Sequence, residues 1–326
     1  VLVTGGLGFV GSHIVDACVA RGDSVFSADD LHSGKRENAN PKAPNFQIDV
    51  SDISKLEGVF REVQPEVVFH CAALARIQPS FQNPERYFEV NAIGTKNVLK
   101  LAKDFKTRRV VYSASSSAYG DQPEPALREG MKLTAQSLHP YGSTKRMGEM
   151  LMRDMGRVTG GPETVCLRYF NVYGPRQTAT ADGPYATVVG IFLDKARKGE
   201  ALTVVPDGAQ KRDFTWVGDV AGANLLAGSS LKVGDGEIIN IGSGKNHSVW
   251  GVASLVLGLD ENTPPEELLK SGKCVMAPPR RGEVRETLAD ISLARNLLGW
   301  QPEVSFEEGI NLLKSKFSDP ERFRIF

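Results

Sequence analysis

A tyrosine and a lysine four residues apart are the side chains in this sequence that most directly suggest shared chemistry. Tyr141 and Lys145 occur in HPYGSTK, and on a helix this spacing places both on one face. A tyrosine has a pKa of ~10 and is a poor base at neutral pH, but nearby cations lower that pKa. It could then accept a proton from an alcohol while hydride leaves the carbon. In isolation, however, the pattern more often marks a core tyrosine beside a solvated lysine.

Three serines upstream strengthen the interpretation of that pair as chemical. Ser115, Ser116 and Ser117 follow the apolar run RVVYSA. Ligands of open α/β sheets bind at the carboxyl ends of the parallel strands, where a serine hydroxyl could donate to the oxygen being oxidised. The alternative is a turn in which the hydroxyls bond to nearby backbone.

A glycine-rich turn opens the chain. The run VLVT leads into Gly5, Gly6, Gly8 and Gly11, and a helical pattern follows directly. Glycines allow a tight turn, close approach of the backbone to a pyrophosphate, and close helix–strand packing. The start of the helix presents amide N–H groups to the phosphates. Its place between a strand and a helix makes this motif much stronger than glycine spacing alone.

An acidic pair ends the second strand-like run. Asp29 and Asp30 lie roughly 20 residues beyond the glycine turn, where a carboxylate hydrogen-bonds an adenosine ribose. Such a carboxylate would repel a 2′-phosphate, so the pattern favours NAD over NADP, with Asp29 as the ribose ligand. Lys35 and Arg36 are the observations that favour NADP. A solvated aspartate pair in a turn is the structural alternative.

The elements that must position these residues alternate between strand and helix. Strand-like runs occur around Val3, Val25, Ile48, Val68 and Val111, and helical patterns cover 12–21, 54–63 and 91–105. TVCLRYFNVYG, from Thr164, is typical of a buried parallel strand. Further patterns predict a helix over 187–198, strands over 202–205 and 238–241, and a closing helix over 307–317.

This order predicts an α/β fold, a Rossmann-type doubly wound parallel sheet with a smaller, interwoven C-terminal substrate lobe. We expect residues 1–174 to form the dinucleotide-binding domain, with 213–242 returning to it. Residues 175–212 and 243–326 would then form the lobe that binds substrate.

Composition limits the classes of partner. The chain has 326 residues, with 39 basic and 39 acidic side chains, so no net field favours nucleic acid or a membrane surface. No apolar run approaches the ~20 residues of a membrane span. The four cysteines form no C-x-x-C pair and the five histidines no ligand spacing. We therefore expect no metal site and a reducing, cytoplasmic location.

Taken together, TGGLGFVGS, HPYGSTK and LRYFNVYGPRQ resemble the extended short-chain dehydrogenase/reductase family, over nearly the whole chain. The resemblance is closest to the UDP-glucose/UDP-N-acetylglucosamine 4-epimerases. It implies that Ser115 is the catalytic hydroxyl, with Ser116 as its rival, that Tyr141 is the base, and that Lys145 holds the cofactor ribose and tunes Tyr141. The NAD-binding residues that it implies are Gly5, Gly8, Phe9, Val10, Gly11, Asp29, Asp49, Val50, Ala72, Ala73, Asn91, Tyr141 and Lys145.

The same resemblance implies a site for a UDP-sugar. Asn171, Arg212 and Arg280 match residues that hold the diphosphate, with Ser115 and Ser116 beside the sugar and Arg281 as a rival for Arg280. Arginine suits this role because its planar fork donates two parallel bonds to phosphate oxygens. Thr287 matches the position beside the C2 substituent of the sugar, where a small side chain leaves room for an N-acetyl group.

Departures from related patterns narrow the reaction. Sugar-nucleotide dehydratases carry an Asp-Glu pair where this chain has Ser116 and Ser117, and decarboxylases typically carry a glutamate there. The resemblance therefore implies 4-epimerisation of UDP-glucose/UDP-galactose, and of their N-acetylated counterparts, through a 4-keto sugar. The alternatives are an epimerase for another nucleotide sugar such as UDP-glucuronate, a sugar-nucleotide oxidoreductase, and a non-catalytic NAD-binding protein. A homodimer built on the Met-rich helix after Lys145 and the helix near Asn91 is also implied.

Overall fold

A seven-stranded parallel sheet forms the larger part of the protein. The computed structural model describes residues 1–124, 126–133, 137–178, 186–278 and 284–317. The strand order is β11-β6-β5-β4-β1-β2-β3, and every neighbouring pair is parallel. The order reverses direction between β1 and β4, which is where open sheets of this type bind their ligands. The Rossmann-type expectation is confirmed.

The strands of this sheet are short and mostly buried, as expected for a sheet covered on both faces. They are β1 (Leu2–Thr4), β2 (Phe26–Ala28), β3 (Asn45–Phe46), β4 (Val67–His70), β5 (Arg109–Ser115), β6 (Glu163–Tyr169) and β11 (Asp235–Ile241).

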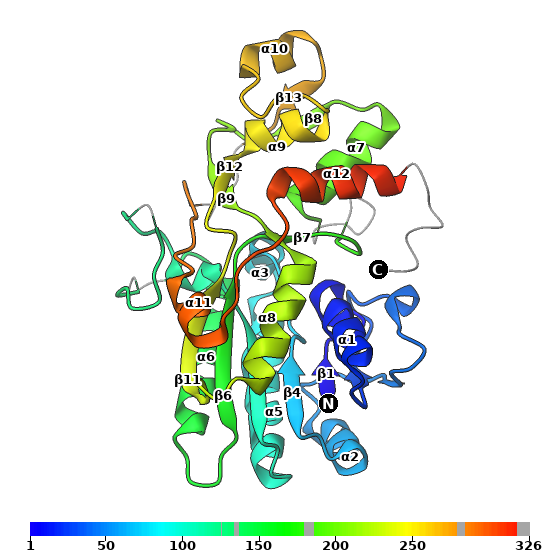
Figure 1. Ribbon diagram of the computed structural model, residues 1–326, viewed down its shortest axis with the longest axis vertical. Coiled ribbons are helices and arrows are strands. Elements are labelled where there is room, and N and C mark those ends of the chain that lie inside the picture. Colours follow the sequence, from blue (N-terminus) through cyan, green and yellow to red (C-terminus); the bar gives the residue numbers. More distant parts are fainter. Residues whose placement is uncertain (125, 134–136, 179–185, 279–283, 318–326) are drawn as a thin grey trace.

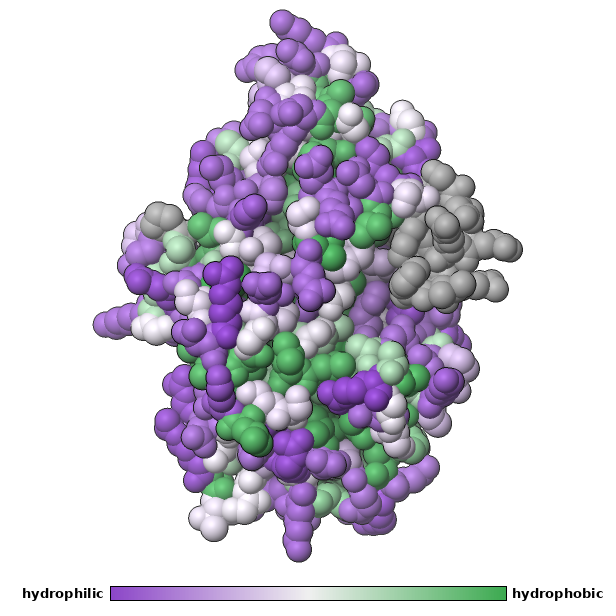
Figure 2. Space-filling model, viewed as in Figure 1, coloured by the Kyte–Doolittle hydropathy of each residue, from purple (hydrophilic) through white to green (hydrophobic). Residues whose placement is uncertain are grey.

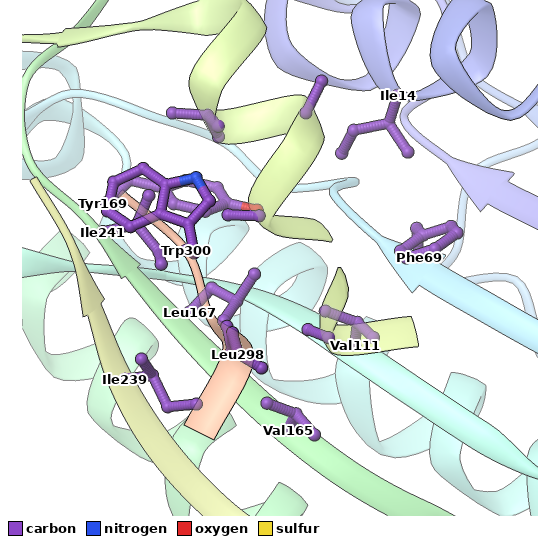
Figure 3. Packing of buried hydrophobic residues seen from close by; sticks show 14 of the residues in the cluster. Ile14, Phe69, Val111, Val165, Leu167, Tyr169, Ile239, Ile241, Leu298 and Trp300 are labelled. Carbon is purple, nitrogen blue, oxygen red and sulfur yellow. The ribbon is translucent and has the colours of Figure 1, made fainter. Parts of the chain in front are cut away.

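Two groups of helices cover the sheet. One face packs against α1 (Phe9–Arg21), α8 (Val217–Ser229) and α11 (Ser292–Leu298). The other face packs against α2 (Ile53–Val63), α5 (Gly94–Asp104) and α6 (Pro140–Gly156). Figure 3 shows side chains of the first core, where Ile14 of α1, Leu298 of α11 and Trp300 meet residues of β4, β5, β6 and β11.

A smaller lobe lies above the sheet in Figure 1 and has its own apolar core. Its helices are α7 (Val188–Lys198), α9 (Val249–Val256), α10 (Pro265–Lys270) and α12 (Phe306–Phe317), and its strands are β8 (Leu202–Val204) and β13 (Cys274–Met276). Two short ladders link the lobe to the sheet: β7 (Val172–Tyr173) with β10 (Thr215–Trp216), and β9 (Lys211–Asp213) with β12 (Asn246–Ser248). The helix α11 packs on the sheet, although its residues fall in the range expected for the lobe.

Short helical segments complete the fold near the reversal point. They are α3 (Ile77–Gln82), α4 (Pro84–Phe88), a π-helical turn (Glu89–Ile93), and 3-10 turns at Arg36–Asn38 and Ser116–Tyr119. No helix among the residues described here has both the length and the apolar character to cross a membrane.

Three expected elements differ in detail. The helix expected over 91–105 begins as the π-helical turn that contains Asn91. The strand around Ile48 is only Asn45–Phe46. The strand from Thr164 divides into β6 and β7, because Asn171 between them has a φ of +22° and interrupts extended backbone.

Candidate active site

The glycine turn connects β1 to α1 and is closed by contacts that admit no side chain. Gly5 has a φ of +69°, and a Cβ there would lie 2.7 Å from the Ala72 nitrogen. A Cβ on Gly11 would lie only 2.0 Å from the Gly5 carbonyl oxygen. The Gly8 N–H donates to that same oxygen at 3.1 Å. The turn therefore brings the first amides of α1 to the edge of a cavity, as phosphate binding requires.

This cavity has a volume of about 420 Å³ and follows the reversal point of the sheet. Most of the residues expected to bind the cofactor line it, namely Gly5, Gly8, Phe9, Val10, Gly11, Asp29, Asp49, Val50, Ala72, Ala73 and Tyr141. Ser115, Ser116 and Asn171 line it as well. We call it the cofactor cavity.

Asp29 and Asp49 are two of the three aspartates among the described residues that line the cofactor cavity. Asp29 is buried and accepts hydrogen bonds from the backbone N–H groups of Leu7 (3.0 Å) and Leu31 (2.8 Å). Burial raises the pKa of Asp29, and these two bonds oppose the rise. Asp49 pairs with Arg86, and although burial acts in the opposite direction, bonds from Ser51 and Arg86 lower its pKa. Both carboxylates are positioned to meet a polar ligand in the cavity.

Ser115 and Tyr141 meet at the opposite part of the cofactor cavity. Ser115 ends β5, and Tyr141 lies in the first turn of α6. Their side chains hydrogen-bond, which lowers the pKa of Tyr141 against the larger, opposing effect of burial. A proton acceptor and a hydroxyl donor can therefore address the same substrate oxygen.

Lys145 lies one helical turn beyond Tyr141 and is buried. Its Nζ donates to the Ser113 carbonyl oxygen at 2.9 Å and lies 6.0 Å from the centroid of the Tyr141 ring. Burial lowers the pKa of Lys145 to about 8, so the group is still mostly protonated at neutral pH. The helix brings this ammonium to the same side as Tyr141, as the four-residue spacing predicts.

Asn91 lies behind the cavity wall. It is buried, its Oδ1 accepts from the Leu74 N–H at 2.7 Å, and its Nδ2 donates to the Thr144 hydroxyl at 3.0 Å. Asn91 therefore connects the segment after β4 to α6, at the residue that precedes Lys145. Its contacts are those of a residue that supports the cavity wall.

A second cavity of about 430 Å³ adjoins the first, and we call it the substrate cavity. Ile77, Ser116, Ser117 and Asn171 line both. Arg212 and Thr287, expected on the substrate side, line this one, as does Lys195 of α7. Cations and small polar groups therefore line a cavity that adjoins the one lined by Ser115 and Tyr141.

Asn171 and Thr287 are joined across the substrate cavity. The Asn171 Nδ2 donates to the Asp213 carbonyl oxygen at 3.0 Å and to the Thr287 hydroxyl at 3.3 Å. Thr287 is buried and lines the substrate cavity. Arg280 and Arg281, the proposed second diphosphate ligand and its rival, lie outside the described residues.

Sequence reasoning missed four residues around this site. Arg76 lines the cofactor cavity, Tyr87 contacts the Tyr141 ring, Arg86 pairs with Asp49, and His139 stacks on Tyr141 with ring centroids 6.1 Å apart. Only His139 carried a local signal, because it immediately precedes the proline that starts α6. The others reach the site through contacts that no sequence spacing reveals.

The geometry fits a bound dinucleotide. A closed glycine turn, the start of a helix and a carboxylate after β2 line one cavity, in the arrangement that pyrophosphate and ribose binding requires. Acid–base groups stand where the reactive ring of such a ligand would meet a second molecule from the substrate cavity.

Comparisons with known proteins find relatives that cover most of the chain. The family model for the NAD dependent epimerase/dehydratase family matches residues 1–242. UDP-glucose 4-epimerase of Mycolicibacterium smegmatis is 34% identical, with 95% of each chain covered. UDP-glucuronate 4-epimerase of Thermodesulfobacterium geofontis is 33% identical, with 95% of this chain and 93% of the relative covered.

Solved structures extend the similarity to the fold. UDP-glucose 4-epimerase from Thermotoga maritima, solved with UDP-glucose, matches with a TM-score of 0.88 at 35% identity, covering 98% of this chain and 99% of that one. UDP-glucose 4-epimerase from Thermus thermophilus, solved with NAD, matches with a TM-score of 0.85 at 35% identity, covering 98% of each chain.

Proposed function

We propose that this chain, which belongs to the NAD-dependent epimerase/dehydratase family, is a UDP-hexose 4-epimerase. The chain is an NAD-dependent enzyme that modifies nucleotide sugars. Our proposal adds the reaction, inversion at C4 of UDP-glucose and UDP-galactose, with the N-acetylated sugars accepted as well. It also adds the roles of individual residues.

One observation carries the choice of reaction. The two cavities share Ser116, Ser117 and Asn171, while Ser115 and Tyr141 line the cofactor cavity. No aspartate or glutamate occurs among the described residues that line the substrate cavity. Elimination of water needs an additional acid–base pair, whereas epimerisation needs only one base and one hydroxyl at the reacting oxygen. Ser116 and Ser117 occupy the positions where carboxylates would serve elimination.

In this proposal, Tyr141 takes the proton from the C4 hydroxyl and Ser115 donates a hydrogen bond to the same oxygen. When bound, NAD would accept the C4 hydride and return it. Tyr141 would return the proton to the C4 oxygen after the 4-keto sugar has turned over to present its other face. The balance is closed, because one proton and one hydride leave and the same two return. The protonated Lys145 favours the ionised form of Tyr141 and would hold the cofactor ribose.

The remaining residues hold the two ligands. The turn from Gly5 to Gly11 would bind the NAD pyrophosphate, and Asp29 the adenosine ribose. Arg212, with Arg280, would hold the UDP diphosphate, because an arginine fork matches phosphate oxygens. Asn171 would hold the sugar nucleotide beside Tyr141, while Thr287 leaves space for a C2 N-acetyl group. We keep the division into a dinucleotide-binding domain and a substrate lobe as part of this proposal, together with a homodimer.

A panel of UDP-sugars incubated with the purified protein tests the proposal. We expect UDP-glucose and UDP-galactose to interconvert. We also expect UDP-GlcNAc and UDP-GalNAc to interconvert, with no net NADH at steady state in either case. Chromatography that resolves the C4 epimers gives the readout. The variant Tyr141→Phe should keep its bound NAD and lose at least ~10²-fold in turnover, because it lacks the proton acceptor.

Three results would remove parts of this assignment. Unchanged turnover in Tyr141→Phe would exclude Tyr141 as the base. Turnover of UDP-galactose with none of UDP-GalNAc would show that Thr287 does not admit the N-acetyl group. Accumulation of NADH would indicate a net oxidoreductase.

A further inference from the structure

Arg76 holds a backbone conformation that is almost confined to glycine. Its φ is +81° and its ψ is 147°, and an L-residue with a side chain adopts this region only at a cost in free energy. Arg76 lies between β4 and α3 and lines the cofactor cavity, as Ser115 and Tyr141 do. Strain of this kind persists where the surrounding structure enforces it and the side chain has a role.

Tyr87 enforces the conformation. This tyrosine of α4 is 1% exposed, and its hydroxyl donates to the carbonyl oxygens of Ala75 (2.5 Å) and Arg76 (3.2 Å). Its ring also stands edge-on to the Tyr141 ring, with centroids 6.3 Å apart and an interplanar angle of 84°. One buried side chain therefore fixes the Arg76 backbone and contacts the proposed base.

The Arg76 charge also acts on Tyr141. Among the described residues that line the cofactor cavity, Arg76 is the single arginine or lysine, and Ser115 and Tyr141 share that lining. Burial raises the pKa of Tyr141, while the bond from Ser115 and the Arg76 charge lower it. Tyr141 and Tyr87 in turn favour the charged form of Arg76, against the effect of its burial.

Other groups around Tyr141 supply less durable charge. His139, the N-cap of α6, stacks on the Tyr141 ring, and burial lowers its pKa to about 4, so it is neutral at pH 7. Lys145, also of α6, has a pKa of about 8 and loses its charge above that pH. An arginine, in contrast, stays protonated throughout. The polar groups that β5, α4 and α6 contribute around Tyr141 are Ser115, Tyr112, Tyr87, His139 and Lys145.

We propose that Arg76 is a positioning residue whose guanidinium keeps a permanent positive charge beside the Tyr141 hydroxyl, supplementing Lys145. The benefit of this charge explains why a strained arginine stands where glycine would fit without strain. The inference rests on the proposed function only in taking Tyr141 as the base.

The test is a spectroscopic titration of Tyr141 in the NAD-loaded protein. The phenolate absorbance is followed against pH in Arg76→Gly and in the wild type, and the same curve from Tyr141→Phe is subtracted to isolate Tyr141. Glycine suits the backbone at position 76, so the variant removes the charge without misfit. We expect the titration midpoint to rise by about one pH unit, and kcat/KM at pH 7 to fall about tenfold.

Two further variants keep the result decisive. Arg76→Lys retains a cation and should keep its midpoint close to that of the wild type. Arg76→Gln is neutral and carries the same backbone strain as arginine at this position, so it should repeat the glycine result and replaces that variant if it fails to fold. An unchanged midpoint in the folded neutral variants overturns the inference. A raised KM for the UDP-sugar without a shifted midpoint also overturns it and makes Arg76 a substrate ligand.

The titration separates this inference from the proposed function, because it requires no turnover. A shifted midpoint in a protein that epimerises none of the UDP-sugars would retain the role of Arg76 and remove the proposed reaction. Epimerase activity with an unshifted midpoint would do the reverse.

Discussion

His139 has two structural roles at the start of α6. It is buried, its Nδ1 accepts the Gly142 N–H at 2.9 Å as the N-cap of α6, and its ring stacks on Tyr141. A protonated imidazole would lose the acceptor that caps the helix. Burial, with a smaller effect from Arg146, lowers the pKa of His139 to about 4, so the imidazole is neutral at pH 7 and keeps its acceptor.

This shift predicts acid sensitivity. The unfolded chain protonates His139 near pH 6.5 and the folded chain only near pH 4, so the unfolded state binds more protons between those values. The titration of His139 therefore leaves the free energy of unfolding unchanged above pH 6.5. As pH falls towards 4, this free energy decreases by about 3 kcal/mol. His139→Asn keeps an N-cap acceptor and should show a smaller loss over that window. Urea unfolding of the NAD-loaded proteins at pH 7, 5.5 and 4.5 measures this; equal losses in both proteins would contradict the assignment.

At the scale of elements, the β1–α1 turn leaves no room for an added side chain at Gly11. In Gly11→Ala the new Cβ would lie 2.0 Å from the Gly5 carbonyl oxygen, so the backbone must shift. We expect a loss of about 3 kcal/mol or more in the free energy of unfolding, with loss of bound NAD.

The matched control is Gly58→Ala in α2. Gly58 is exposed, and a Cβ there would meet no atom within 4 Å. This variant should gain about 0.5–1 kcal/mol, because alanine loses less conformational entropy in a helix. Thermal unfolding and NAD content of both variants provide the readout. A Gly11→Ala protein as stable as Gly58→Ala would show that the turn is looser than its contacts indicate.

The sequence alone was sufficient to predict the elements whose signals lie within one short segment of the chain. The glycine turn, β5 and α6 follow from spacing and periodicity, and they position Gly8, Ser115 and Tyr141. The division of β6 from β7 was missed because Asn171 interrupts an apolar run that reads as continuous. Arg76 and Tyr87 were missed because their significance lies in the approach of α4 to α6, which no spacing along the chain records.

At the scale of the whole molecule, two regions with exposed apolar side chains on the helices that cover the sheet are candidates for an interface between two copies of the chain. One is the face formed by α4, the π-helical turn and α6, which we call the α4/α6 face; it carries Phe88 (36% exposed), Ile93 (48%), Met147 (42%) and Met150 (64%). The other is the region of α8, where Figure 2 shows green residues below the centre of an otherwise mainly hydrophilic face. Leu226 of α8 is 39% exposed.

The α4/α6 face is the better candidate for the proposed homodimer, because its exposed side chains come from three adjoining elements and include flexible methionines that adapt to a partner. A stable dimer buries about 800 Å² on each chain with an apolar centre.

Met150→Glu places a charge at the most exposed side chain of the α4/α6 face and should convert the dimer into a monomer, measured by analytical ultracentrifugation. Leu226→Glu adds the same charge to the α8 region and should leave the dimer intact. A dimer disrupted by Leu226→Glu but not by Met150→Glu would move the interface to α8, and a wild-type monomer at micromolar concentration would exclude the homodimer. Because α4 and α6 also carry Tyr87 and Tyr141, dissociation should slow turnover as these helices lose the partner that supports them.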